Sequence, residues 1–324
     1  MKYLDLYVKI NLLIGKEVFL LEKIAVIDLG SNSVRMSVFG IESGVAKTLG
    51  AYRSTIRLSE GMTADMMLSA EAQLRAVKAL AGYKKTIESE GVERLVAVAT
   101  AAVRKAKNRD EFLELVKDST GIEIRVIDGT QEAALDCLAV SRTLECERGV
   151  ICDIGGGSTE LIGVSGGAQR SAVSIPFGSR GICEMFFKDG ETPEAIAAAE
   201  EFVRGKYQSE EWLKEFRGAA VVGIGGTLRA AAKFDLGDST AAAIEKYVIT
   251  PERMSEIIGE ILLASVDERK KMVGIGKERA DIILGGLLFI KCLAEVLNPK
   301  EFVIADVGVR EGVLFDILEK RNIL

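Results

Sequence analysis

Two stretches of the chain, IAVIDLGSNSVRMSVF (residues 24–39) and GVICDIGGGSTELIGV (residues 149–164), superpose without a gap. Each begins with an apolar run typical of a buried strand, continues through Asp, one residue and Gly, and ends in a second strand-like run. Asp28 matches Asp153, and Gly30 matches Gly155. The repeat predicts two similar domains, each beginning with a β-hairpin whose loop carries an Asp-x-Gly turn, facing each other across a cleft.

Apolar runs and helical patterns alternate along the rest of the chain. Strands are predicted at 95–99, 122–127, 168–175, 219–222 and 302–305, and helices at 69–91, 110–118, 278–297 and 310–320. Further helices are predicted to begin at N-caps Thr130, Thr192 and Thr250, and a tight turn at 223–227 is predicted to lead into another helix. This alternation predicts an α/β architecture.

The length of 324 residues suits two domains, and 48% hydrophobic residues can fill a large core. We predict domain I at 23–131 with the C-terminal helix 309–324, and domain II at 132–308. Residues 1–22 mix apolar runs with charges and contain neither a membrane-spanning stretch nor a signal peptide pattern. We interpret them as a poorly packed extension or as the result of a start site placed too early.

The chain contains no His, which excludes Ser-His-Asp and Cys-His nucleophiles and His-ligated zinc. Proton transfer must therefore use carboxylates, Lys, Tyr or Cys. The net charge of −6 argues against nonspecific nucleic-acid binding. Five Cys without a CxxC motif indicate reduced thiols in a cytoplasmic protein.

Paired Gly-rich hairpins suit phosphate binding, because backbone N–H groups can approach an anion closely where no Cβ intervenes. Two such loops facing each other could hold a chain of phosphates. Acidic residues beside them suit a divalent cation that bridges to phosphate oxygens. The predicted metal ligands are Asp153, Glu160 and Asp28, although turn capping alone also accounts for Asp in such loops. The predicted phosphate contacts are Gly30, Ser31, Asn32, Ser33, Gly155, Gly156, Gly157 and Ser158.

The chain resembles the Ppx/GppA family, the exopolyphosphatases and guanosine pentaphosphate phosphohydrolases. The matching blocks follow the family's order over nearly the whole chain from residue 24. They are IDLGSNSVRM (27–36), ATAAVRKAKNRDEF (99–112), IDGTQEA (127–133), DIGGGSTEL (153–161), SIPFGSRG (174–181), VVGIGGTLRA (221–230) and ERADIILGG (278–286).

This resemblance implies the two-domain actin/sugar-kinase/Hsp70-like (ribonuclease H-like) fold, here in its short form, with an interdomain cleft. It also implies hydrolysis, with Mg²⁺ or Mn²⁺, of the terminal phosphate of inorganic polyphosphate or of the 5′-γ-phosphate of guanosine pentaphosphate. A cytoplasmic homodimer without nucleic-acid or membrane partners is consistent with it. The family's catalytic carboxylate matches Glu132, whereas Asp128 and Gln131 replace the family's Ser and first Glu.

A polyanionic substrate also requires cations, and Arg35, Arg104 and Arg279 lie within the matching blocks. Each could equally be a solvated or ion-paired surface residue. Lys105 and Lys107 form a small basic run that we interpret as exposed. The turn formed by Gly225, Gly226 and Thr227 could bind a nucleotide or further phosphates, or could simply connect a strand to a helix.

Three functions remain open on this reading. The first is a phosphohydrolase in which Glu132 activates an in-line water. The second is a non-hydrolytic sensor of guanosine tetraphosphate, guanosine pentaphosphate or another nucleotide. The third is an ATP-dependent kinase of a small molecule, for which no sugar-kinase block is present.

Overall fold

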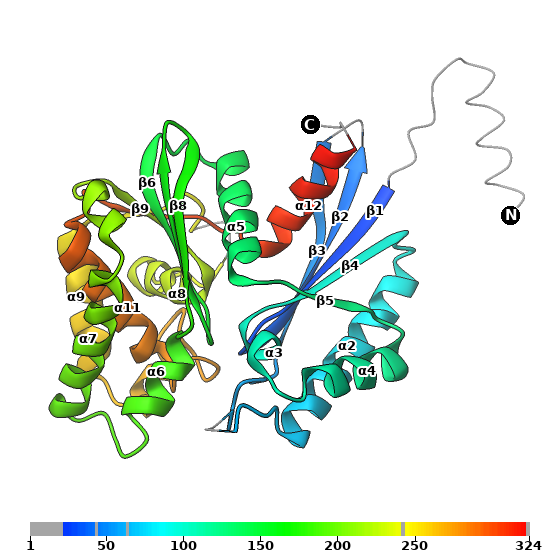
Figure 1. Ribbon diagram of the computed structural model, residues 1–324, viewed down its shortest axis with the longest axis horizontal. Helices are drawn as coiled ribbons and strands as arrows, with labels where there is room; N and C mark the ends of the chain where they lie inside the picture. The colour runs from blue at the N-terminus through cyan, green and yellow to red at the C-terminus, as the bar shows by residue number, and fades with distance from the viewer. Residues whose placement is uncertain (1–21, 43–44, 63–64, 241–243, 322–324) are drawn as a thin grey trace, which may run out of the picture.

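The computed structural model describes residues 22–42, 45–62, 65–240 and 244–321 and contains two mixed sheets (Figure 1). Most of the extension predicted at 1–22 lies outside the described residues. Sheet 1 has the order β3-β2-β1-β4-β5, and sheet 2 has the order β10-β11-β9-β6-β7-β8. The strands of sheet 1 are β1 (Glu22–Leu29), β2 (Ser33–Glu42), β3 (Val45–Thr55), β4 (Arg94–Ala99) and β5 (Ile124–Val126). Those of sheet 2 are β6 (Arg148–Ile154), β7 (Thr159–Ser165), β8 (Ala168–Ile175), β9 (Ala220–Ile224), β10 (Val248–Ile249) and β11 (Phe302–Ile304).

The two sheets share one topology, which confirms the α/β fold predicted from the repeat. In each sheet, three consecutive strands form an antiparallel meander, β1-β2-β3 or β6-β7-β8. Two later strands then extend the sheet in parallel with its first strand, β4 and β5 in sheet 1 and β9 and β11 in sheet 2. The division into domains at residues 131, 132 and 308 remains a prediction.

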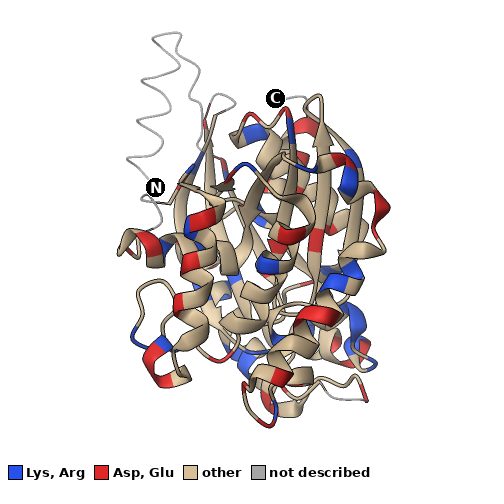
Figure 2. Cartoon of the chain, turned by 90° about the vertical axis from the view of Figure 1, so that its left-hand side faces the viewer, with Lys and Arg blue, Asp and Glu red and all other residues tan. Residues whose placement is uncertain are grey.

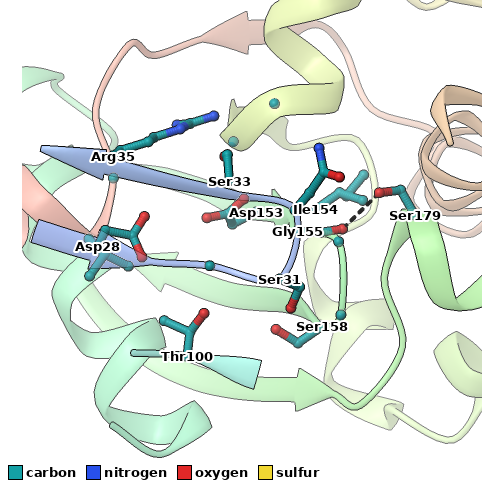
Figure 3. Close-up of a pocket in the computed structure, with 18 of the residues that line it drawn as sticks. Asp28, Ser31, Ser33, Arg35, Thr100, Asp153, Ile154, Gly155, Ser158 and Ser179 are labelled. Carbon is teal, nitrogen blue, oxygen red and sulfur yellow. Dashed lines mark hydrogen bonds between the residues drawn. The ribbon is translucent and has the colours of Figure 1, made fainter. Parts of the chain in front are cut away.

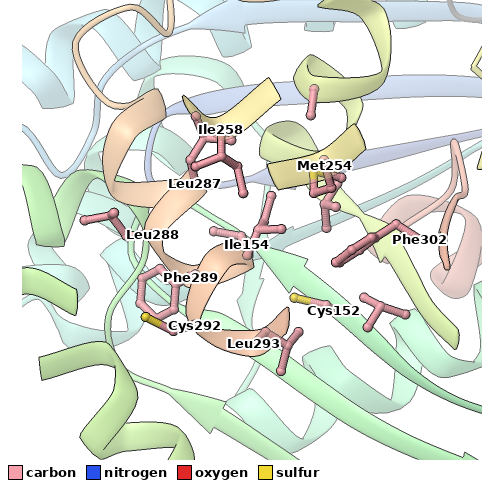
Figure 4. Close-up of a cluster of buried hydrophobic side chains, with 14 of the residues drawn as sticks. Cys152, Ile154, Met254, Ile258, Leu287, Leu288, Phe289, Cys292, Leu293 and Phe302 are labelled. Carbon is pink, nitrogen blue, oxygen red and sulfur yellow. The ribbon is translucent and has the colours of Figure 1, made fainter. Parts of the chain in front are cut away.

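Helices cover both faces of each sheet, because the strands are apolar on both sides. The helices α2 (Ala70–Ser89), α3 (Ala101–Lys105) and α4 (Arg109–Thr120) pack on one face of sheet 1. Sheet 2 packs against α7 (Pro193–Gln208), α8 (Gly225–Leu236), α9 (Pro251–Leu263) and α11 (Ile283–Leu297). The apolar side chains of α11 fill this larger core (Figure 4). The remaining helical segments are α6 (Ser179–Phe186), α10 (Val266–Arg269) and the 3-10 helix Glu211–Phe216.

Two helices meet between the sheets, α5 (Gly129–Thr143) and α12 (Val309–Lys320) (Figure 1). α5 covers the inner face of sheet 2, whereas α12 packs on sheet 1 against Ile24, Val26 and Phe39. Gly312 permits their close approach, because a Cβ there would lie 2.2 Å from the Leu135 carbonyl oxygen. The outer helices carry basic and acidic residues interspersed (Figure 2), and no described helix is long and apolar enough to cross a membrane.

Several predicted boundaries were confirmed and others were wrong. Ser69, Thr192 and Thr250 are N-caps whose side chains accept backbone N–H groups. Thr130 is not a cap, because Asp128 occupies that position. The helix predicted at 278–297 begins only at Ile283, the turn predicted at 223–227 is split between β9 and α8, and the strand predicted at 122–127 is limited to 124–126.

Candidate active site

The repeated hairpins bring their loops to one pocket between the two sheets (Figure 3). Gly30 N–H donates to the Ser33 carbonyl oxygen over 3.1 Å, and Gly155 N–H donates to the Ser158 carbonyl oxygen over 3.0 Å. The two turns are therefore closed by the same hydrogen bond at matching positions. All eight predicted loop contacts, 30–33 and 155–158, line the pocket.

The loops touch each other across the pocket, and glycine makes this approach possible. A Cβ on Gly157 would lie 2.4 Å from Ser31 Oγ, and a Cβ on Gly156 would lie 3.3 Å from Ser31 Cβ. The side chains Ser31 and Ser158 are both buried. A phosphoryl group held here would meet backbone N–H groups from both halves of the protein.

Asp28 and Asp153, which match in the repeat, line this same pocket (Figure 3). Burial raises the pKa of both carboxyls, and Arg35 opposes that rise at Asp28 while Arg229 and Arg35 oppose it at Asp153. Neither carboxylate is an acceptor in the side-chain hydrogen bonds between described residues, whereas Glu160 and Asp306 each accept one. Their oxygens are thus free to ligate a cation.

The donor set fits Mg²⁺, which proteins often hold by one or two carboxylates together with water and substrate phosphates. The described residues contain no cluster of three or more His, Cys, Asp or Glu with metal-ligand spacing. Glu160 lies outside the pocket lining, is buried, and accepts a hydrogen bond from Ser174 Oγ over 2.7 Å. Asp28 and Asp153 are therefore better placed than Glu160 to hold the ion.

Glu132 enters the pocket from the first turn of α5 and is only 6% exposed. Its Oε2 accepts a hydrogen bond of 2.9 Å from Arg104 Nη1, and the same nitrogen donates to the Ile127 carbonyl oxygen. Burial raises the pKa of Glu132 to about 7, against the lowering effect of Arg104. The carboxylate is thereby fixed in place and titrates close to neutrality, as a general base requires.

The replacements Asp128 and Gln131 build the start of α5. Asp128 Oδ1 accepts the Gln131 N–H over 2.8 Å, and Gln131 Oε1 accepts the Asp128 N–H over 3.1 Å. This reciprocal capping box holds the first helical turn, which carries Glu132. Both residues are exposed, and neither lines the pocket.

The predicted cations separate into two groups. Arg35 and Arg279 line the pocket, whereas Arg104 lies behind it as the partner of Glu132. Arg279 reaches the pocket across Gly226, where a Cβ would lie 2.0 Å from Arg279 Nη2. Burial and the neighbouring cations lower the pKa of Arg279 to about 9.

The three residues of the Gly225-Gly226-Thr227 turn also separate into residues that line the pocket and one that does not. Gly225 and Gly226 line the pocket, and a Cβ on Gly225 would lie 1.9 Å from Asp153 Oδ1. Thr227 is buried and packs against Gly286 instead. The turn therefore makes room for Asp153 and Arg279.

Sequence reasoning missed several lining residues, namely Thr100, Ser179, Arg229, Gly308, Val309 and Arg310. Arg229 lies within the block at 221–230, so its position in that block was an available signal. The interpretation of Lys105 as exposed was wrong: its Nζ donates to the Gly157 carbonyl oxygen over 2.6 Å and to the Pro176 carbonyl oxygen over 2.7 Å. Lys107 is exposed.

A buried carboxyl lies one helical turn beyond Glu132. Asp136 is 0% exposed, and neither of its oxygens has a hydrogen-bond partner among the described residues. Burial, and then the charge of Asp153, raise its pKa well above the usual range. Asp136 therefore holds its proton more tightly than an ordinary aspartic acid does.

Two lobes of matching topology, each with an Asp-x-Gly hairpin turned toward a shared pocket, define the actin/sugar-kinase/Hsp70-like class of fold. The family model described as "Ppx/GppA phosphatase family" matches residues 37–321, and the chain belongs to that family. A Haemophilus influenzae protein named "Putative exopolyphosphatase" is 30% identical over an alignment of 304 residues, and the match covers 91% of each chain.

Solved structures agree with this assignment. The crystal structure of the Aquifex aeolicus Ppx/GppA family member superposes with a TM-score of 0.77 at 29% identity and covers 94% of this chain and 99% of its own. The crystal structure of an exopolyphosphatase from Cytophaga hutchinsonii superposes with a TM-score of 0.87 at 22% identity and covers 92% of this chain and 98% of its own. The likeness to the Cytophaga structure concerns the fold alone.

Proposed function

We propose that this protein is a phosphohydrolase that releases the terminal phosphate of inorganic polyphosphate or the 5′-γ-phosphate of guanosine pentaphosphate. The observation that carries the proposal is the position of Glu132, a buried carboxylate that faces both phosphate-binding turns in one pocket. Membership in a phosphatase family and the similarity to the Haemophilus influenzae protein support the same reaction class.

In the proposed reaction, a water between Glu132 and the loops attacks the terminal phosphorus. Glu132 takes a proton from this water while the new P–O bond forms and the bond to the bridging oxygen breaks. The products are inorganic phosphate and a chain that is one phosphate shorter. Arg104 keeps the Glu132 carboxylate in one orientation, with its Nη1 2.9 Å from Oε2.

The loop N–H groups and Arg35 and Arg279 would bind the phosphoryl oxygens and stabilise the charge that develops on them. Asp28 and Asp153 would hold Mg²⁺, which neutralises phosphate charge and fixes the orientation of the phosphoryl group. The N–H groups of Gly156 and Gly157 lie where the loops meet, so positioning depends on both halves of the protein.

Phosphate release from long-chain polyphosphate, guanosine pentaphosphate and ATP, each with Mg²⁺, tests the proposal. Turnover of either of the first two in preference to ATP would support it. Transfer from ATP to a small acceptor would favour a kinase, and tight binding of guanosine tetraphosphate without turnover of any substrate would favour a sensor.

A further inference from the structure

A second cavity, of about 210 Å³, adjoins the active-site pocket on the side of β3 and α8, and we call it the outer chamber. It shares five lining residues with the active-site pocket, so the same side chains border both spaces. The shared residues are Arg35, Gly226, Arg229, Arg279 and Arg310. Arg53 and Lys233 line the outer chamber but not the active-site pocket.

Two pairs of like charges build this chamber. Arg53 lies directly opposite Arg35 in the β2–β3 register, and like charges facing each other across strands are destabilising. Lys233 follows Arg229 by four residues on α8, where like charges also repel. One pair comes from sheet 1 and the other from a helix on sheet 2, so the fold brings together cations from both halves.

Carboxylates neutralise only part of this charge. Arg229 Nη1 lies 2.5 Å from Asp306 Oδ1, and Arg53 Nη1 lies 3.6 Å from Glu278 Oε2, which is well exposed. Among the described residues, no carboxylate lies within 4.0 Å of the charged groups of Arg35, Lys233 and Arg279. An anion in the chamber would relieve this repulsion.

The pKa shifts of Lys233 and Arg53 agree with an excess of positive charge in the outer chamber. Partial burial lowers the pKa of Lys233, the nearby arginines lower it further, and Asp306 opposes them. Burial also lowers the pKa of Arg53. Arginine suits paired contacts to phosphate oxygens, and a flexible lysine adds a mobile point charge.

We propose that the outer chamber is a second phosphoryl subsite, which binds phosphates farther along the substrate than the triphosphate end held by the active-site pocket, with Arg53 and Lys233 as its own ligands. The proposal rests on the proposed function, since it places the rest of the same substrate. The distal phosphates of a linear polyphosphate and the 3′-diphosphate of guanosine pentaphosphate both supply the required chemistry.

The test compares Arg53→Gln, Lys233→Gln and the double variant with two matched controls at exposed positions, Arg109→Gln and Lys300→Gln. Phosphate release is measured from long-chain polyphosphate, from guanosine pentaphosphate and from tripolyphosphate, which under this proposal occupies the active-site pocket alone. We expect the KM for long-chain polyphosphate or for guanosine pentaphosphate to rise about tenfold in the double variant, as loss of a charge-assisted contact implies. We expect kcat/KM for tripolyphosphate, and all values for the controls, to stay within about twofold.

The substrate that responds identifies the source of the distal phosphates, and either response supports the subsite. Equal weakening of tripolyphosphate would overturn it, because the two residues would then act on the terminal phosphate. Unchanged KM for both longer substrates would overturn it as well.

A binding measurement separates the subsite from catalysis. Long-chain polyphosphate and guanosine pentaphosphate are titrated onto each protein in EDTA, and the double variant should bind one of them about tenfold more weakly than the wild type. If the wild type bound these substrates in EDTA but hydrolysed none of them with Mg²⁺, the proposed function would be wrong. A loss of binding in the double variant would still support the subsite. Thermal unfolding without phosphate serves as the folding check, and the double variant should be no less stable, because it removes repulsion.

Discussion

Arg35 and Glu160 occupy equivalent positions in the two hairpins: Arg35 lies opposite Asp28 in the β1–β2 register, and Glu160 lies opposite Asp153 in the β6–β7 register. The backbone repeat is therefore conserved within the chain while the charge at this position is reversed. Arg35 faces the pocket, whereas Glu160 is buried against Ser174. At this position the first hairpin directs a cation into the pocket, and the second hairpin buries a carboxyl outside it.

Replacement of Glu132 by Gln should lower kcat by about 10²- to 10⁴-fold, the usual contribution of a general base. The KM should change little, because the two Asp-x-Gly turns are closed by their own backbone hydrogen bonds and not by this side chain. Phosphate release from polyphosphate measures both constants, and Glu111→Gln, at an exposed position in the first turn of α4, is the matched control. Near wild-type kcat in Glu132→Gln would remove Glu132 from the mechanism.

The pH dependence of the reaction should follow the ionisation of the same carboxyl. Because the pKa of Glu132 is raised to about 7 and the base must be deprotonated, kcat/KM should rise with pH through an acid limb near that value. Arg104 lowers this pKa, so Arg104→Gln should move the limb to higher pH. A limb that stays in place in Arg104→Gln would contradict the coupling seen in the 2.9 Å contact.

Lys105 should act on substrate binding by holding the second turn in place. Burial and then Arg104 lower its pKa to about 8, while Glu160 and Glu132 oppose this. Its hydrogen bonds to the Gly157 and Pro176 carbonyl oxygens lose their charge assistance above that pH. In the wild type, we expect the KM to rise as the pH exceeds the pKa of Lys105. In Lys105→Met, the KM should be higher than in the wild type at every pH. In Lys105→Arg, the KM should not show the alkaline rise. Parallel KM profiles for wild type and Lys105→Arg would argue against this role.

Asp136 should make the wild type lose stability as the pH rises. Its folded-state pKa is raised above the unfolded value of 3.8, so the folded protein holds the proton more tightly. The stabilisation is complete below the unfolded pKa and falls as pH rises toward the folded pKa. Thermal unfolding is measured at about pH 5 and about pH 8. The stability of Asp136→Asn relative to the wild type should be greater at the higher pH. A constant difference between the two curves would show that Asp136 does not keep its proton.

Gly225 should be irreplaceable for a reason beyond its backbone angle. Gly225 and Gly237, at the two ends of α8, have φ of +77° and +64°, so an Ala at either position would cost about 1 kcal/mol in folding stability. Only at Gly225 does the new Cβ meet Asp153, and nothing lies within 4 Å of a Cβ on Gly237. Phosphate release should fall at least about tenfold in Gly225→Ala alone. Equal activities in the two variants would exclude this steric explanation.

The repeat allowed the sequence to predict the two sheets and the paired turns, because a strand, an Asp-x-Gly turn and a second strand are local patterns. The side chains that complete the pocket come from distant segments, and their directions depend on packing. Arg310 lies in the first turn of the last helix, and Arg104 turns toward Glu132 rather than toward the pocket. No local pattern records these contacts.

The missed elements have similar physical causes. β3 is an edge strand whose sequence VAKTLGAYRST is largely exposed, so its apolar alternation is weak. The apolar run before Leu297 continues upstream of α11, but residues 278–282 form turns that direct Arg279 into the pocket. At the start of α5, Asp128 and Thr130 are both good caps, and the reciprocal bond with Gln131 decides in favour of Asp128.

The position of α12 has a consequence for synthesis on the ribosome. The strands of sheet 1 are complete once Val126 has been made, but the helix that covers Ile24, Val26 and Phe39 follows the whole of sheet 2. Nascent chains expose that apolar face until the final segment emerges, so the first half cannot mature before the second. Chaperone contact should therefore fall on this face during translation, and both lobes should acquire protease resistance together.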